Sequence, residues 1–279
     1  MEITKDIVIL YHANCPDGFG AAYAAWKKFG DSADYLPVSH GNMPPEGLGG
    51  KEVYIVDFSY PKEILLVLEK DAHKLTVLDH HIGSQEAVEA TQNHTFDIDR
   101  SGAGIAWSYF HPDVPLPRLL AHIQDNDLWR HTIPNGKEIS AFLGTVPFTF
   151  ESFDAVAEQM ENEESFSKLV SKGAAFSEYY NHICESIVSG AEEVQFDEFT
   201  VLAVNASGIF KSEVGHRLAT KKGPFAIVWY GREGHWHCSL RGDGSIDLSE
   251  IAKRYGGGGQ YGAASFRIPI NQPLPFHTL

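Results

Sequence analysis

The sequence has few cysteines, no long apolar run and no basic N-terminal segment. Its 279 residues include three cysteines, Cys15, Cys184 and Cys238, which are odd in number and widely spaced. This usage excludes a disulfide framework and predicts a reducing compartment, the cytoplasm. The opening residues 1–6 lack the features of a signal peptide, and no stretch approaches the roughly 18 apolar residues of a membrane helix. We therefore expect a cytoplasmic protein with no membrane partner.

Basic residues are also scarce. Lysine and arginine total 22 against 37 aspartates and glutamates, so the net charge is −15. This balance excludes a protein that coats long duplex nucleic acid through a general basic surface. The negative charge does not exclude a small anionic substrate, because bound divalent cations can reverse the local electric field. The apolar share of 43% is that of an ordinary globular protein, and the length suits one large domain or two smaller ones.

Three apolar runs of β type end in polar residues that suit a metal. The runs and the residues that follow them are 7–11 before His12, 53–56 before Asp57, and 74–78 before Asp79, His80 and His81. Apolar strand residues can enter a core, whereas a carboxylate and two imidazoles cannot follow them unpaired. A single strand end of this kind is ordinarily a polar cap. Three in one half of the chain favour a site that faces a metal or a ligand.

Helical patterns separate these runs, which indicates a parallel α/β sheet. We predict helices at 18–29, 61–70 and 84–93, and further strands at 33–38 and 95–98. In parallel sheets, functional groups gather at the carboxyl ends of the strands. The candidate groups at those ends are His12, Asp17, Asp57, Asp79, His80 and His81.

The rest of the chain predicts a second domain. Residues 102–131 look helical and contain Asp125 and Asp127, and an acidic helical segment follows at about 150–187. Strand-like runs return at 200–204, 225–230 and 236–240, before a helix at 248–255 and four glycines. We predict an α/β fold with a parallel-sheet domain at 1–150, a helical linker at 151–190 and a smaller α/β domain at 191–279.

The polar residues predict a two-ion centre. Mixed histidine and carboxylate ligands suit Mn²⁺ or Mg²⁺ better than Zn²⁺, since the cysteines lie outside the pattern apart from Cys15. Two ions about 3.5–4 Å apart, bridged by a carboxylate, activate a water and stabilise the leaving oxygen of a phosphoryl displacement. We expect Mn²⁺ as the cofactor, with Mg²⁺ as the alternative.

Several motifs, in the right order, resemble those of the DHH superfamily of phosphoesterases that carry a C-terminal DHHA1 domain. Residues 79–81 match the naming motif, 12–18 the first motif, Asp57 the second and Asp125 the fourth. Residues 256–266 resemble the glycine-rich DHHA1 signature. The resemblance covers nearly the whole chain. It implies kinship with RecJ-type exonucleases, nanoRNases and cyclic-dinucleotide phosphodiesterases, and, through the first domain alone, with manganese pyrophosphatases.

The resemblance also implies residue roles. Asp57 would bridge the two ions, His81 would face the substrate phosphate, and Asp79 would orient a histidine. Asp17, His80 and Asp125 would complete the ligands of one ion. His12 would help to hold the other ion, and Asn14 is a further candidate ligand there. Asp127 rivals Asp125, because the Asp-x-Asp spacing leaves the register open.

Two positions depart from the family pattern. Asn14 or Cys15 stands where an aspartate is common, and a neutral Asn oxygen would hold a cation less firmly. Cys15 is a candidate thiol ligand beside the site, but we favour its interpretation as a small packing residue. Gln260 stands where DHHA1 domains commonly have histidine, and it can donate a hydrogen bond to a phosphate without carrying charge.

The second domain is expected to bind one end of a substrate. Glycines let a backbone approach a ligand closely, and an arginine can bind a phosphate through two parallel hydrogen bonds. The expected substrate-binding residues are Arg241, Gly257, Gly258, Gly259 and Gln260. The implied partner is a short oligonucleotide or dinucleotide, and a homodimer is compatible with the sequence.

Three functions stay open at this point. The first is a phosphodiesterase that hydrolyses short oligonucleotides or dinucleotides to nucleoside monophosphates. The second is a pyrophosphate or polyphosphate phosphohydrolase, and the third a catalytically weakened nucleotide sensor or scaffold. The DHHA1-like half favours the first over the second. The intact set of histidines and aspartates favours an enzyme over a sensor.

Overall fold

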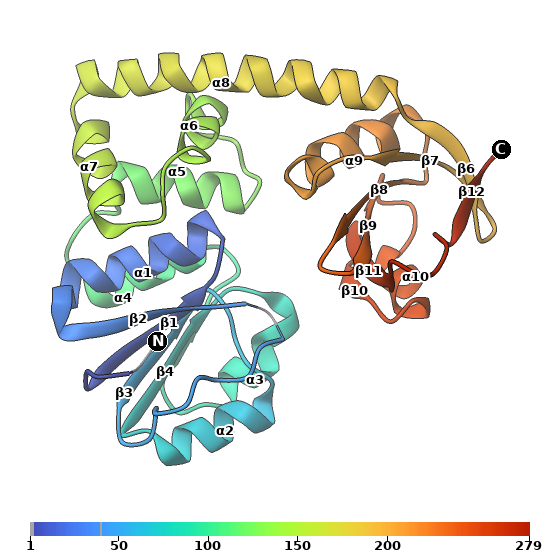
Figure 1. The fold of residues 1–279 in the computed structure, drawn as a ribbon. Helices are drawn as coiled ribbons and strands as arrows, with labels where there is room; N and C mark the ends of the chain where they lie inside the picture. The colour runs from blue at the N-terminus through green and yellow to red at the C-terminus, as the bar shows by residue number, and fades with distance from the viewer. Residues whose placement is uncertain (1–2, 40) are drawn as a thin grey trace. The chain divides into compact units, whose positions relative to one another are not determined.

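The computed structural model describes residues 3–39 and 41–279, so the first two residues of the N-terminal stretch considered above lie outside it (Figure 1). Contacts divide the chain into two compact units, Met1–Ser177 and Glu178–Leu279. Each unit has apolar clusters of its own. No helix in the described residues combines the length and apolar character needed to cross a membrane.

The first unit is built on a five-stranded sheet in the order β2-β1-β3-β4-β5. All of its neighbouring strands are parallel. The strands are β1 (Ile7–His12), β2 (Ala33–Val38), β3 (Glu52–Val56), β4 (Lys74–Asp79) and β5 (His94–Phe96). The predicted parallel α/β fold is confirmed, and β1, β3 and β4 lie side by side in the middle of the sheet.

Helices cover both faces of this sheet (Figure 1). Ile9 and Val56 pack toward α1 and α4, whereas Leu10 and Ile55 pack toward α2 and α3. Burial from both sides explains why the strands are continuous apolar runs. The helices of this unit are α1 (Pro16–Phe29), α2 (Lys62–Asp71), α3 (Gln85–Glu89), α4 (Gly102–Phe110), α5 (Arg118–Asp127), α6 (Gly136–Leu143) and α7 (Phe150–Glu161), with 3₁₀ turns η1 (Gly30–Ser32) and η2 (Ile82–Ser84).

One long helix, α8 (Glu163–Ser189), runs through the division between the units. Its early residue Phe166 belongs to a core cluster of the first unit, and its late residue Cys184 to a cluster of the second. The segment predicted as a linker is therefore helical. Helix α7, however, packs into the first core through Phe153 and Met160, because its apolar residues form a buried face.

The second unit contains a mixed seven-stranded sheet in the order β10-β11-β9-β8-β7-β6-β12, in which only β7 and β8 pair in parallel. Helix α9 packs on one face and α10 on the other. The strands are β6 (Glu192–Phe196), β7 (Phe199–Asn205), β8 (Phe225–Arg232), β9 (His235–Gly242), β10 (Gly258–Gln260), β11 (Ala263–Pro269) and β12 (Phe276–Thr278); the helices are η3 (Gly208–Phe210), α9 (Lys211–Lys221) and α10 (Leu248–Arg254). The strands β6, β10, β11 and β12 were not predicted. β10 and β12 are three residues long and largely exposed, so they carry no apolar pattern.

Arg118 ties α5 to the corner between α7 and α8, which leads to a stability prediction. Its guanidinium lies 3.5 Å from the centroid of the Phe166 ring and donates to the Met160 carbonyl at 3.1 Å. Arg118→Ala should lower the free energy of unfolding by about 1–2 kcal/mol, mainly through loss of these two contacts, because its third contact, an ion pair with Glu163, is largely exposed. Lys168→Ala, which removes an exposed pair with Glu164, is the control and should have almost no effect. Equal losses in chemical denaturation would contradict this reading of Arg118.

Candidate metal centre

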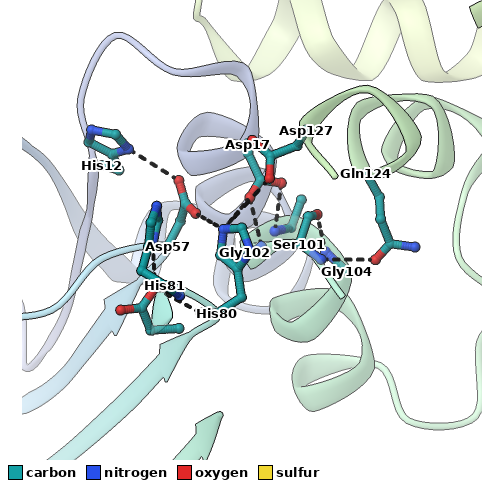
Figure 2. Close-up of polar contacts among 12 residues, drawn as sticks. His12, Asp17, Asp57, His80, His81, Ser101, Gly102, Gly104, Gln124 and Asp127 are labelled. Carbon is teal, nitrogen blue, oxygen red and sulfur yellow. Dashed lines mark hydrogen bonds and ion pairs between the residues drawn. The ribbon is translucent and has the colours of Figure 1, made fainter. Parts of the chain in front are cut away.

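The polar residues that follow β1, β3 and β4 lie together at one edge of the first sheet (Figure 2). β1 ends at His12, Asp57 directly follows β3, and Asp79 is the last residue of β4. Because these strands are parallel neighbours, their carboxyl ends meet at the same edge. The structure thus brings side chains from three separate strand ends into one cluster.

Asp57 lies at the centre of this cluster. Its side chain is 2% exposed, and its backbone adopts a left-handed conformation with φ 61°. His12 Nδ1 lies 3.4 Å from Asp57 Oδ2, and His80 Nε2 lies 3.3 Å from Oδ1. Neither Asp57 oxygen accepts a hydrogen bond from the described residues. A buried carboxylate without such bonds is costly, so the two oxygens of Asp57 are available to a divalent cation.

Asp17, in the first turn of α1, is held by the start of α4. Its two oxygens accept hydrogen bonds from Gly102 N at 2.6 Å and Ala103 N at 3.0 Å. These N–H groups have no partner within their helix, and the helix N-terminus favours a negative charge. A Cβ at Gly102 would overlap Asp57, so the close approach requires glycine. Sequence reasoning missed this contact, although Ser101 before small residues signals a helix start.

Of the two rival aspartates, Asp127 lies in the cluster, whereas Asp125 does not. Asp127 Oδ2 lies 3.6 Å from His80 Nε2. Asp125 instead accepts hydrogen bonds from the backbone N–H and hydroxyl of Thr132 and from Ile133 N. Residues two apart on a helix point about 200° away from each other, so only one of the pair can face the histidines. Asp125 therefore fixes the turn after α5.

Asp79 is fully buried and orients His81. Its Oδ1 accepts hydrogen bonds from His81 Nδ1 at 2.7 Å and from the backbone N of His80 at 2.8 Å, and Ser84 donates to Oδ2. The bond to Asp79 raises the pKa of His81 above its ordinary value. The histidine that Asp79 positions is therefore His81, while His80 Nε2 faces Asp17, Asp57 and Asp127.

Negative charge is concentrated in the cluster. Burial, and then the charge of Asp57, raise the pKa of both Asp17 and Asp127. Burial would also raise the pKa of Asp57, but the imidazoles of His12 and His80 outweigh it and hold that pKa below its usual range. Within the described residues, no lysine or arginine forms an ion pair with these aspartates. A divalent cation would relieve this repulsion, and the nitrogen and oxygen donors fit one.

Three groups of side chains place their ligand atoms within 4.8 Å of one another. The groups are His12 with Cys15 and Asp57, Asp57 with His80 and His81, and Asp17 with His80 and Asp127. Asn14 is exposed and adopts a left-handed φ of 57° in the turn after β1. Burial and the charge of Asp57 raise the pKa of the Cys15 thiol to about 12.

In the second unit, Arg241 and Gln260 lie on one face of the sheet. Arg241 on β9 is opposite Ala263 on β11, which is opposite Gln260 on β10, so the three residues form a row across the strands. The guanidinium donates to Ser212 Oγ at 3.1 Å and to the Leu240 carbonyl at 2.8 Å. Burial lowers the pKa of Arg241. Because the Ala263 side chain is small, it fills little of the space between the side chains of Arg241 and Gln260.

The glycines at 256–259 serve strand packing, and some of them also line a cleft. A Cβ at Gly257 would overlap the Ser265 carbonyl, so this glycine allows β10 to lie against β11, and Gly259 approaches β11 in the same way. Gly257 and Gly258 line a cleft of about 680 Å³ together with Ser265 and Arg267. Among the described residues, the lining of this cleft includes neither Arg241 nor Gln260.

Comparison with known sequences gives one informative relative. No protein-family model matches the chain. The uncharacterized protein R106 of Acanthamoeba polyphaga mimivirus is 32% identical over 299 residues, which cover 98% of this chain and 70% of that protein.

Solved structures share the fold. A DHH domain described as a member of the S1p family of ribosomal proteins has a TM-score of 0.56 and 15% identity over 94% of this chain and 82% of its own. The pGpG-specific phosphodiesterase PggH of Vibrio cholerae has a TM-score of 0.53 and 13% identity over 95% and 94%. An exopolyphosphatase-related protein of Bacteroides fragilis has a TM-score of 0.50 and 14% identity over 98% and 89%. These likenesses show a fold of the DHH type.

The positions of Asp127 and Asp125 predict that the same substitution affects metal binding at one residue and stability at the other. Asp127→Asn should weaken Mn²⁺ binding at least about tenfold, because it removes a charged oxygen next to His80. Asp125→Asn should leave Mn²⁺ binding nearly unchanged and lower thermal stability, because its carboxylate holds the turn after α5. Calorimetric titration and thermal unfolding of both variants test this assignment. A larger loss of Mn²⁺ affinity in Asp125→Asn would return the ligand role to that residue.

Proposed function

We propose that this chain, which belongs to the same protein family as the mimivirus protein R106 and has the fold of DHH-domain proteins, is a metal-dependent phosphoesterase. The buried cluster around Asp57 carries the proposal. There, carboxylates and imidazoles from three strand ends and two helices converge, and within the described chain no basic side chain other than histidine pairs with them. Such a donor set is suited to divalent cations, with Mn²⁺ as our first choice and Mg²⁺ as the second.

We propose a separate role in the reaction for each residue of the cluster. Asp17, His80 and Asp127 form one ligand set, and Asp57 extends from it toward His12. Divalent cations held there supply charge that stabilises a transferring phosphoryl group and lowers the pKa of a bound water. Asp79 fixes the His81 ring and raises its pKa, which keeps a proton available for an oxygen of the phosphate. The proposed role of His81 is therefore to face the substrate.

We further propose that the substrate is a dinucleotide or a short oligonucleotide, hydrolysed to nucleoside monophosphates. The second unit supports this class, because Arg241 and Gln260 flank Ala263 in one row. Adjacent strands lie about 4.8 Å apart, so the two backbones are separated by about 10 Å, enough to admit a phosphate or a ribose. Lys211 adds a second cation near Arg241, whose charge lowers the pKa of Lys211 after the larger effect of burial. In a chain of net charge −15, this pair suits an anionic group.

A phosphoanhydride substrate such as pyrophosphate or polyphosphate is the second candidate. The cluster around Asp57 would serve it equally well, since the same charges develop in both reactions. The arrangement of Arg241 and Gln260 favours a nucleotide, because a pyrophosphate ion needs no second binding surface. A sensor that binds nucleotides without hydrolysing them is the third candidate, and the complete cluster argues against it.

Metal removal combined with a substrate panel tests the proposed function. The protein is stripped with chelator, supplied with Mn²⁺, and incubated with dinucleotides, short oligonucleotides, cyclic dinucleotides and pyrophosphate. We expect nucleoside monophosphates from the dinucleotides, detected by mass, with activity abolished by excess chelator and by Asp57→Asn. Full turnover in chelator would refute the metal dependence. Consumption of pyrophosphate alone would select the second candidate, and binding of nucleotides without products would select the sensor.

Arg241 predicts a difference between two kinds of substrate. Arg241→Ala should raise KM for a dinucleotide about tenfold, the effect of losing roughly 1.4 kcal/mol of charge-assisted contact. A small chromogenic phosphodiester lacks the second phosphate or sugar and should be almost unaffected. Arg254→Ala is a matched control, since that arginine is exposed and paired with Glu198. Equal effects on both substrates would exclude substrate binding by Arg241.

A further inference from the structure

Cys15 lies in the candidate metal centre in a way that packing does not explain. Its sulfur, a nitrogen of His12 and an oxygen of Asp57 all lie within 4.8 Å of one another. Of the described residues, those in the four apolar clusters do not include Cys15, and its side chain is only partly buried. The other two cysteines, Cys184 and Cys238, are fully buried members of such clusters. The interpretation of Cys15 as a packing residue therefore lacks support.

Helix capping does not explain this cysteine either. Cys15 is the N-cap of α1, but its side chain makes no capping hydrogen bond. Serine, threonine, aspartate and asparagine are the residues that stabilise this position, and cysteine is not among them. The preceding left-handed turn at Asn14 and the following Pro16 fix the backbone on either side. This local geometry carries the Cys15 side chain toward Asp57 while Asn14 lies exposed.

A second observation points to a ligand at the same place. The Asp57 carboxylate is 2% exposed. The imidazoles of His12 and His80 lie 3.4 and 3.3 Å from its oxygens, but neither oxygen accepts a hydrogen bond of regular geometry from a described residue. Its Oδ2 is the oxygen nearest to His12. A carboxylate buried in this way needs a positive partner, and the three side chains that surround the position supply nitrogen, sulfur and oxygen.

We propose that Cys15 supplies a thiolate to the cation held by His12 and Asp57, so that this position selects a softer ion than its neighbour. This inference rests on the proposed metal-dependent function. When the sulfur–metal bond forms, the thiol proton passes to solvent, and the N-terminus of the 14-residue helix α1 favours the resulting anion. Thiolates select borderline-soft cations of the Zn²⁺ and Co²⁺ class. Asp17, His80 and Asp127 contain no sulfur and suit a hard ion such as Mn²⁺.

Cobalt substitution tests the proposal through a signal that does not depend on activity. Metal-free protein is titrated with Co²⁺, and the near-ultraviolet absorption that arises from a thiolate bound to cobalt is recorded. We expect this band in the wild type and in the double variant Cys184→Ser with Cys238→Ser, in which Cys15 is the only thiol. It should be absent in Cys15→Ser. Cys15→Asp should lower the affinity of this position for Zn²⁺ at least about tenfold and raise that for Mn²⁺.

The outcomes separate this inference from the proposed function. A wild-type protein that hydrolyses phosphodiesters with Mn²⁺ but gives no thiolate band with bound Co²⁺ would overturn the role of Cys15 and leave the phosphoesterase standing. A band that persists in Cys15→Ser would also overturn it. If Cys15→Ser does not fold, X-ray absorption on zinc-loaded wild type decides the matter. A sulfur neighbour at about 2.3 Å supports the proposal, and its absence refutes it.

Discussion

Uncompensated negative charge at a buried edge of a sheet is the constraint on which the rest of this structure depends. Asp57 is almost fully buried, and Asp17 and Asp127 share the neighbourhood of His80. Burial, and then the neighbouring charge of Asp57, raise the pKa values of Asp17 and Asp127. Histidines offset part of this repulsion. The remainder calls for cations, so the same charges that oppose folding of the empty site favour metal binding.

The secondary structure around the cluster serves to hold these charges in place. Three parallel strands supply residues at their carboxyl ends, and the start of α4 supplies two N–H donors to Asp17. Gly102 allows α4 to approach Asp57 closely, and Asp57 itself adopts a left-handed backbone conformation. Such strain costs of order 1–3 kcal/mol and persists only where surrounding packing compensates for it. The strands β1, β3 and β4, whose central residues are buried, provide that packing.

The centre is asymmetric in its chemistry. One side offers nitrogen and oxygen atoms from Asp17, His80 and Asp127, and the other adds the sulfur of Cys15 beside His12. Asp57 lies between the two sides, so the donor atoms available on either side of this carboxylate differ in softness. The second unit has different chemistry: Arg241 and Gln260 flank the small residue Ala263 on one face of the sheet, and Lys211 begins helix α9 near Arg241. In the function proposed above, the first unit would cleave the bond and the second would bind the substrate.

Apolar patterning alone determined most of the fold. The runs before His12, Asp57 and Asp79 are buried on both faces, so their type and parallel arrangement follow from period and composition. The strands β10 and β12 were not predictable, because their three-residue segments carry no apolar period of their own and exist through pairing with β11 and β6. The extent of the linker was likewise decided by packing, since the apolar face of α7 joins the first core.

The sequence by itself also identified which residue types gather at the strand ends, whereas only the tertiary structure decided their individual roles. Asp125 and Asp127 are alike in sequence, but the rotation of about 100° per residue along α5 directs only Asp127 toward His80. The sequence favoured Asn14 over Cys15 as a ligand, whereas the turn before α1 leaves Asn14 exposed and places Cys15 beside Asp57. Strand ends are set by local pattern, but the direction of a side chain at the end of a helix or in a turn depends on how the whole element packs.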